Sequence, residues 1–150
     1  MELSLEYRPL QESIKVLVAE DLALNQLLIK TLLEDFGFQY EIVHNGKAAL
    51  KKLEETSYDI VLMDLQMPVM DGLEAAKRIR FEMKLKVPVL AVTANSTDED
   101  RIRCAEAGMD DLIGKPIDDE ALFRKIIYLV NASRASGELL HLAGKEIQSR

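Results

Sequence analysis

Five side chains with the chemistry of a metal or phosphoryl site stand at the ends of short apolar runs. Glu20 and Asp21 follow the first run, Asp64 the third, Thr93 the fourth and Lys115 the fifth. If these runs are parallel strands of one sheet, their carboxyl ends meet at one edge, where such sheets bind ligands. The sequence therefore predicts one polar site assembled from four separate segments.

The three acids of this predicted site need a counter-charge. Like-charged carboxylates repel by roughly 4 kcal/mol per pair at about 4 Å and an effective dielectric constant of about 20. Either one carboxylate keeps its proton or a hard cation binds. Mg²⁺ suits such a site because it prefers oxygen ligands, typically one or two carboxylates together with phosphate oxygens. Lys115 adds a single positive charge, too little to neutralise three acids alone. We therefore expect Mg²⁺, with Glu20 and Asp21 as metal ligands.

Asp64 is the best candidate for a nucleophile. It ends the central apolar run and precedes the loop of residues 66–72. A carboxylate beside Mg²⁺ and a lysine can attack phosphorus and become an acyl phosphate, because both cations absorb charge on the phosphoryl oxygens. The Thr93 hydroxyl and the Lys115 ammonium are expected to contact those oxygens.

The elements that must position these residues alternate in type along the chain. Short β-branched or apolar runs are separated by longer segments of helical period, the pattern of an open parallel sheet with helices on both faces. The second run alternates in polarity, which predicts an edge strand. The predicted strands are Lys15–Ala19, Phe38–Val43, Asp59–Met63, Val87–Val92 and Asp110–Ile113.

The first helix is predicted between the first two strands. Leu24, Leu28, Leu32 and Phe36 repeat every four residues and are expected to form one apolar stripe, with Gly37 as the C-terminal stop. 

Four further helices follow. They are predicted at Gly46–Glu55, in segments that open at Asp71 and at Ser96, and at Asp118–Val130. Glu74 and Glu99 stand three residues after the proposed caps, which is typical of capping boxes, and Gly108 is expected to close the fourth helix.

Length and composition favour one globular domain. The 150 residues are 48% hydrophobic and carry a formal net charge of −7, which disfavours direct binding to nucleic acid. The single cysteine, Cys104, has no disulfide partner in the chain, and no apolar run approaches the roughly 18 to 20 residues that span a bilayer. We expect a cytoplasmic protein without membrane contact. The expected division is an extension at 1–13, a domain at 14–131, and a tail or linker at 132–150 that could form a short helix.

Four motifs together resemble the receiver domains of two-component response regulators over about Ile14 to Asn131. They read KVLVAED at 15–21, DIVLMDLQMPVMDG at 59–72, VPVLAVTA at 87–94 and GMDDLIGKP at 108–116. The resemblance implies an α/β, flavodoxin-like, doubly wound five-stranded parallel sheet in the order 2-1-3-4-5 with five helices. The stretch EDLALNQ at 20–26 is most similar to receivers of hybrid sensor histidine kinases.

The same resemblance implies roles for the acids. Asp64 would accept a phosphoryl group from the phosphohistidine of a histidine kinase or a histidine phosphotransfer protein. Mg²⁺ would be held by Asp21, Asp64 and the main-chain carbonyl of Gln66, while Glu20 would act through metal-bound water. Such a domain catalyses only its own phosphorylation and autodephosphorylation within a phosphorelay, and is not otherwise an enzyme.

The resemblance also implies how the switch works. Lys115 would contact the phosphoryl group, Thr93 would move to hydrogen-bond it, and the bond before Pro116 would be cis. A homodimer could form through the fourth helix, fifth strand and fifth helix. Two positions depart from the family pattern: Leu112 replaces the usual aromatic switch residue, and Leu22 replaces the familiar Asn after the acidic pair.

Two other functions remain open from the residues. One is a Mg²⁺-dependent hydrolase that forms an aspartyl phosphate and turns over a small substrate; such hydrolases usually have a second Asp where this chain has Gln66. The other is a receiver-like scaffold that binds partners without being phosphorylated, suggested only by Leu112 and Leu22.

Overall fold

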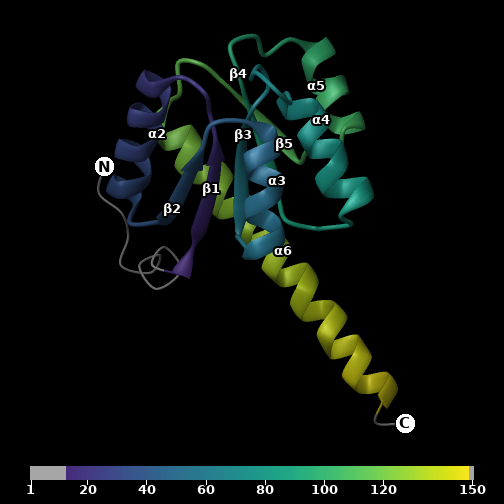
Figure 1. Cartoon of the computed structure of the whole chain (residues 1–150). Coiled ribbons are helices and arrows are strands. Elements are labelled where there is room, and N and C mark those ends of the chain that lie inside the picture. The colour runs from purple at the N-terminus through teal and green to yellow at the C-terminus, as the bar shows by residue number, and fades with distance from the viewer. Residues whose placement is uncertain (1–12, 149–150) are drawn as a thin grey trace.

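One parallel sheet of five strands forms the centre of the molecule (Figure 1). The computed structural model describes the backbone of residues 13–148 and the side chains of residues 13–137. The strand order is β2-β1-β3-β4-β5, which confirms the predicted order and places β2 at an edge. The strands are β1 (Lys15–Ala19), β2 (Gln39–Val43), β3 (Ile60–Asp64), β4 (Val89–Thr93) and β5 (Asp111–Gly114).

Helices cover both faces of this sheet, as the predicted doubly wound fold requires (Figure 1). Residues of β1 alternate between two apolar clusters, with Val16 and Val18 on one face and Leu17 and Ala19 on the other. The first cluster packs against α2 and α6, and the second against α3, α4 and α5. The helices are α2 (Ala23–Phe36), α3 (Gly46–Glu55), α4 (Gly72–Lys77) with its π-helical continuation η2 (Arg78–Glu82), α5 (Asp98–Glu106) and α6 (Asp119–Gln148).

The buried face of α2 differs from the predicted leucine stripe. Ile29, Leu33 and Phe36 are buried, whereas Leu24 and Leu28 are 68% and 56% exposed. Four residues advance about 400° around an α-helix, so a four-residue repeat drifts by about 40° at each step. Over the three steps from Leu24 to Phe36 the repeat moves about 120° around the helix, and only its C-terminal end faces the sheet.

Helix ends confirm some predictions and correct others. Asp71 caps α4 by accepting a hydrogen bond from the main-chain nitrogen of Glu74 at 2.8 Å, as predicted. The predicted cap Ser96 is wrong: Thr97 caps α5 by accepting from the Asp100 nitrogen at 3.1 Å. Gly108 follows α5 with φ of 87°, a conformation that favours glycine.

The observed strands are shifted slightly from the predicted ones. Four of them begin one or two residues later than predicted, and three end one residue later. Asp64 and Thr93 are therefore the last residues of their strands.

The last helix is longer than predicted. The expected end at Val130 is wrong, because α6 continues to Gln148 and projects from the domain (Figure 1). Where it leaves the sheet, Arg134 lies 3.3 Å from Asp59 and contacts Ser13. The division at residues 13 and 131 stays a prediction, and residues 1–12 lie outside the described part. No helix within residues 13–148 has the length and hydropathy to cross a membrane.

Candidate functional site

Three carboxylates meet at the carboxyl ends of β1 and β3. Ala19 pairs with Met63 across these strands, so the residues that follow them, Glu20 and Asp64, lie side by side. One oxygen from each of Glu20, Asp21 and Asp64 lies within 4.8 Å of the others. Glu20 is 1% exposed and Asp64 5%, whereas Asp21 is half-buried at the opening. The predicted acidic cluster is therefore present, with one side open to solvent.

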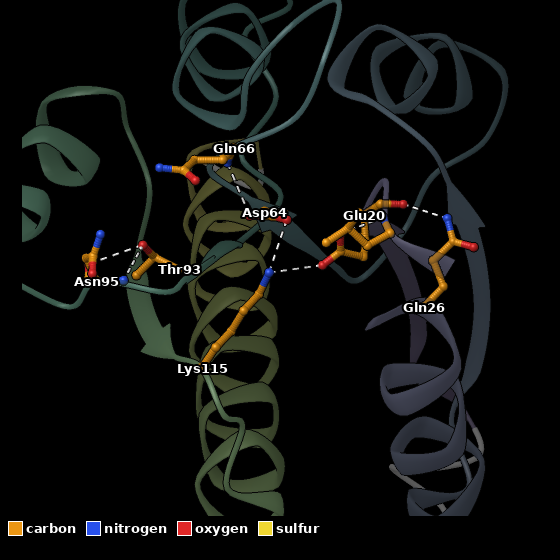
Figure 2. Close-up of polar contacts among 8 residues, drawn as sticks. Glu20, Gln26, Asp64, Gln66, Thr93, Asn95 and Lys115 are labelled. Carbon is orange, nitrogen blue, oxygen red and sulfur yellow. Dashed lines mark hydrogen bonds and ion pairs between the residues drawn. The ribbon is translucent and has the colours of Figure 1, made fainter. Parts of the chain in front are cut away.

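Lys115 joins the two buried acids (Figure 2). Its Nζ lies 3.1 Å from Oε1 of Glu20 and 3.2 Å from Oδ2 of Asp64. Burial alone would lower the pKa of Lys115, but the hydrogen bond to Glu20 and the charge of Asp64 outweigh it and raise the pKa above its usual value. One ammonium can offset the charge of only one of the three carboxylates, and this surplus of acids favours binding of a divalent cation.

The loop after β3 is fixed close to Asp64. The main-chain nitrogen of Gln66 donates to Oδ1 of Asp64 at 3.1 Å, and the nitrogen of Gly72 donates to the carbonyl of Leu65 at 3.1 Å. A side chain at position 72 would overlap the carbonyl oxygen of Asp64, so only glycine allows α4 to begin this close to the strand end. The Asp-Gly pair at 71–72 thus caps α4 and lets it approach Asp64.

Thr93 lies at the same edge but outside this charged cluster. Its hydroxyl donates to the carbonyl of Asn95 at 3.1 Å and accepts from the Asn95 nitrogen at 3.2 Å (Figure 2). An open pocket of about 620 Å³ has Asp21, Gln66 and Thr93 in its lining. Asp21 and Thr93 therefore lie in the lining of one pocket beside the end of β3.

The remaining predicted positions are also placed. The peptide bond between Lys115 and Pro116 is cis, as the resemblance implied. Leu112 is buried in β5 at 3% exposure, and Leu22 is 57% exposed beside the acids. The role of the Gln66 carbonyl stays a prediction.

Two polar contacts at the site were not anticipated from sequence. Asn95 holds the Thr93 hydroxyl, and Gln26 of α2 donates to the main-chain carbonyl of Glu20 at 2.6 Å. Gln26 stands within the EDLALNQ stretch, so the only signal was its place in a motif, with no indication of what its amide contacts.

The donor set suits a hard divalent cation. Every side chain of the cluster offers carboxylate oxygen, the ligand type that Mg²⁺ prefers, and none offers sulfur or imidazole nitrogen. The half-buried Asp21 leaves room for the waters that Mg²⁺ usually keeps. The residues therefore fit a Mg²⁺ site.

Residues 16–127 match the response regulator receiver domain family. The chain belongs to this family. The receiver is 44% identical over 121 residues to hybrid signal transduction histidine kinase I of Dictyostelium discoideum, an alignment that covers 75% of this chain. The aligned part is only 7% of that relative, which is a much longer protein that contains one region similar to this chain.

Solved structures show the same relationship. The receiver domain of sensor histidine kinase PA1611 from Pseudomonas aeruginosa PAO1, crystallised with magnesium in its active-site cleft, is 34% identical with a TM-score of 0.72. The match covers 79% of this chain and 98% of that one. The receiver domain of Ssk1 from Saccharomyces cerevisiae, crystallised with the histidine phosphotransfer protein Ypd1, is 33% identical with a TM-score of 0.71, covering 75% and 86%.

Proposed function

We propose that this receiver accepts a phosphoryl group on Asp64 in a Mg²⁺-dependent phosphorelay reaction and thereby switches the binding of a partner. The observation that carries the proposal is the convergence of Glu20, Asp21 and Asp64 within 4.8 Å, with Lys115 bridging Glu20 and Asp64. The surplus of acids in this cluster favours a divalent ion, and Asp21 and Gln66 line an open pocket beside it.

The metal would be held by residues on the open side of the cluster. Asp21, Asp64 and the main-chain carbonyl of Gln66 would be direct ligands, with Glu20 acting through bound water. When bound, Mg²⁺ would supply positive charge that stabilises the phosphoryl oxygens during transfer.

The protein's own groups would carry out the transfer. A carboxylate oxygen of Asp64 attacks phosphorus, the bond from phosphorus to the donor imidazole nitrogen breaks, and its electron pair stays on that imidazole. The Lys115 ammonium, already 3.2 Å from Asp64, would neutralise charge on the new acyl phosphate. Thr93 would exchange its bond to Asn95 for one to the phosphoryl group.

The donor would be a histidine kinase or a histidine phosphotransfer protein that docks beside the site. Leu24 and Leu28 are exposed on α2, and an apolar groove of about 750 Å³ separates that helix from residues 115–117. Because Lys115 lines the groove and contacts Asp64, a partner seated there would bring its imidazole near the nucleophile. The complex of Ypd1 with the Ssk1 receiver supports this class of donor.

The output surface is proposed at α5, β5 and α6. Ile102 of α5 and Tyr128 of α6 are 59% and 71% exposed, which would suit a homodimer or another protein partner. With a net charge of −7, direct binding of nucleic acid is not proposed. A cytoplasmic location stays a prediction.

Chemical phosphorylation tests this function. Acetyl phosphate or phosphoramidate with Mg²⁺ should add one phosphoryl group, measured by intact mass, and Asp64→Asn should abolish the addition. Asp98→Asn, an exposed acid in the first turn of α5, is the matched control and should label like the wild type. Labelling of Asp64→Asn would remove Asp64 from its role. Repeated turnover of a small phosphorylated substrate would favour the hydrolase, and refusal of every donor by the wild type would favour the scaffold.

A further inference from the structure

The side-chain amide of Gln26 links helix α2 to the loop that carries two of the acids. Its nitrogen Nε2 donates to the main-chain carbonyl of Glu20 at 2.6 Å and lies 3.0 Å from Nδ1 of His44 (Figure 2 shows the first contact). A carbonyl oxygen only accepts hydrogen bonds, so the nitrogen of the amide must face it. The second proton of that nitrogen points to the His44 ring, whose Nδ1 then acts as the acceptor.

The carbonyl that Gln26 holds belongs to the peptide between Glu20 and Asp21. Its orientation therefore sets where the Asp21 side chain begins. On the other side, the Glu20 nitrogen donates to the carbonyl of Val43 at 3.0 Å, and the Leu22 nitrogen donates to Oε2 of Glu20 at 3.0 Å. Within residues 13–137 the Asp21 carboxylate itself has no hydrogen bond or ion pair, so no polar contact of its own holds it in place.

We propose that Gln26 is a positioning residue for the divalent cation. By fixing the Glu20 to Asp21 peptide, its amide holds the Asp21 carboxylate in range of Glu20 and Asp64 before the ion arrives. The inference rests on the proposed function, in that the acids bind Mg²⁺. It predicts that Mg²⁺ affinity depends on a donor at position 26, although Gln26 itself does not belong to the acidic cluster.

Calorimetric titration with Mg²⁺ alone, without any phosphodonor, tests this role. Gln26→Met keeps the length of the side chain and removes both donors, and should weaken Mg²⁺ binding by about tenfold, as lost outer partners of metal ligands commonly do. Gln26→Glu separates geometry from charge. Its extra negative charge alone would strengthen cation binding, whereas loss of the donor and repulsion of the Glu20 carbonyl would weaken it; we expect weaker binding.

A matched control lies one turn further along the same helix. Lys30→Met changes an exposed residue of α2 and should leave the Mg²⁺ dissociation constant within about twofold of the wild type. Urea denaturation should show that all three variants are folded. With phosphoramidate as donor, both Gln26 variants should need more Mg²⁺ for half-maximal labelling yet reach the wild-type rate at saturation, a separation that general loss of structure would not produce.

The outcomes separate this inference from the function on which it rests. Wild-type affinity in Gln26→Met, or tighter binding in Gln26→Glu, would overturn the positioning role while leaving Asp64 phosphorylation intact. A wild-type protein that bound no Mg²⁺ and took no phosphoryl group would instead overturn the proposed function. If Gln26→Met did not fold, Gln26→Glu would decide by the sign of its effect.

Discussion

Replacing Lys115 by methionine removes the cation that joins the two buried acids. Its Nζ lies 3.1 Å and 3.2 Å from their oxygens, and each contact is worth about 5 kcal/mol before desolvation at an effective dielectric constant of about 20. Loss of one partner from a buried ion pair typically costs about 3 to 5 kcal/mol. The lysine side chain is 23% exposed, so we expect the lower end, about 3 kcal/mol, in the free energy of unfolding.

This loss should depend on Mg²⁺. In a chelator the acids of Lys115→Met have no counter-charge, whereas millimolar Mg²⁺ can supply it and should restore about 1 to 2 kcal/mol more than it adds to the wild type. The same variant should bind Mg²⁺ more tightly, because the ammonium no longer competes for the carboxylates. Since the pKa of Lys115 is raised, its contribution is complete at pH 7 and is lost only as pH rises through that raised value.

Urea denaturation at pH 7, with and without Mg²⁺, measures both effects. Lys125→Met is the matched control: Lys125 pairs with Asp111 at 2.8 Å, where the two side chains are 33% and 31% exposed, and its loss should cost about 1 kcal/mol or less whatever the Mg²⁺ concentration. An equal loss for Lys115→Met in chelator and in Mg²⁺, or weaker Mg²⁺ binding, would refute the argument that the lysine and the metal ion neutralise the same carboxylates.

Three further substitutions test helix capping, a hydrogen bond between tyrosine and a carboxylate, and core packing. Leu22 occupies the N-cap of α2 without a capping hydrogen bond, so Leu22→Asn should raise the free energy of unfolding by about 1 kcal/mol. The Tyr58 hydroxyl donates to Glu41 at 2.8 Å and lowers the pKa of that carboxyl. Tyr58→Phe should cost about 1 kcal/mol at pH 7, a difference that shrinks as pH falls through the lowered pKa of Glu41 and its carboxyl becomes protonated. Ile29→Ala should cost about 3 kcal/mol because Ile29 is 2% exposed, whereas Leu28→Ala should change stability by less than about 0.5 kcal/mol.

Urea midpoints check all three, each against its own control. Leu22→Ala lacks a capping oxygen and should give no gain, so equal stabilisation by both variants would contradict the cap. Tyr40→Phe removes a bond to the exposed Glu34 and should cost less than Tyr58→Phe. A Tyr58→Phe deficit that stayed constant throughout an acid titration would exclude Glu41 as its cause.

The fold and the residues of the site were largely predictable because each depends on short segments. Apolar runs predict strands, and the rule that parallel strands share one carboxyl edge brings Glu20, Asp64 and Lys115 together. What sequence could not supply is distance. Only the structure shows that one ammonium contacts both buried acids while the Thr93 hydroxyl is bound to Asn95, because these contacts depend on loop conformation.

The longer α6 shows a different kind of error. The predicted end at Val130 is wrong, and the residues that follow it also favour a helix. No proline follows Val130, and Ala132, Arg134 and Ala135 are all good helix formers. Gly137 costs about 1 kcal/mol in a helix interior, which did not stop the helix.

The face that α2 buries, which differs from the predicted one, determines where Gln26 lies relative to the site. The leucine repeat and the observed core face of Ile29, Leu33 and Phe36 point about 100° apart around the helix, at about 100° per residue. Gln26 stands about 50° from the observed core direction, close enough to the sheet edge to reach Glu20. Turning α2 to bury Leu24, Leu28 and Leu32 would leave Gln26 about 160° from the sheet, in solvent. The face that α2 buries therefore decides whether its first turn can hold the acidic loop, and the leucines stay exposed beside the site.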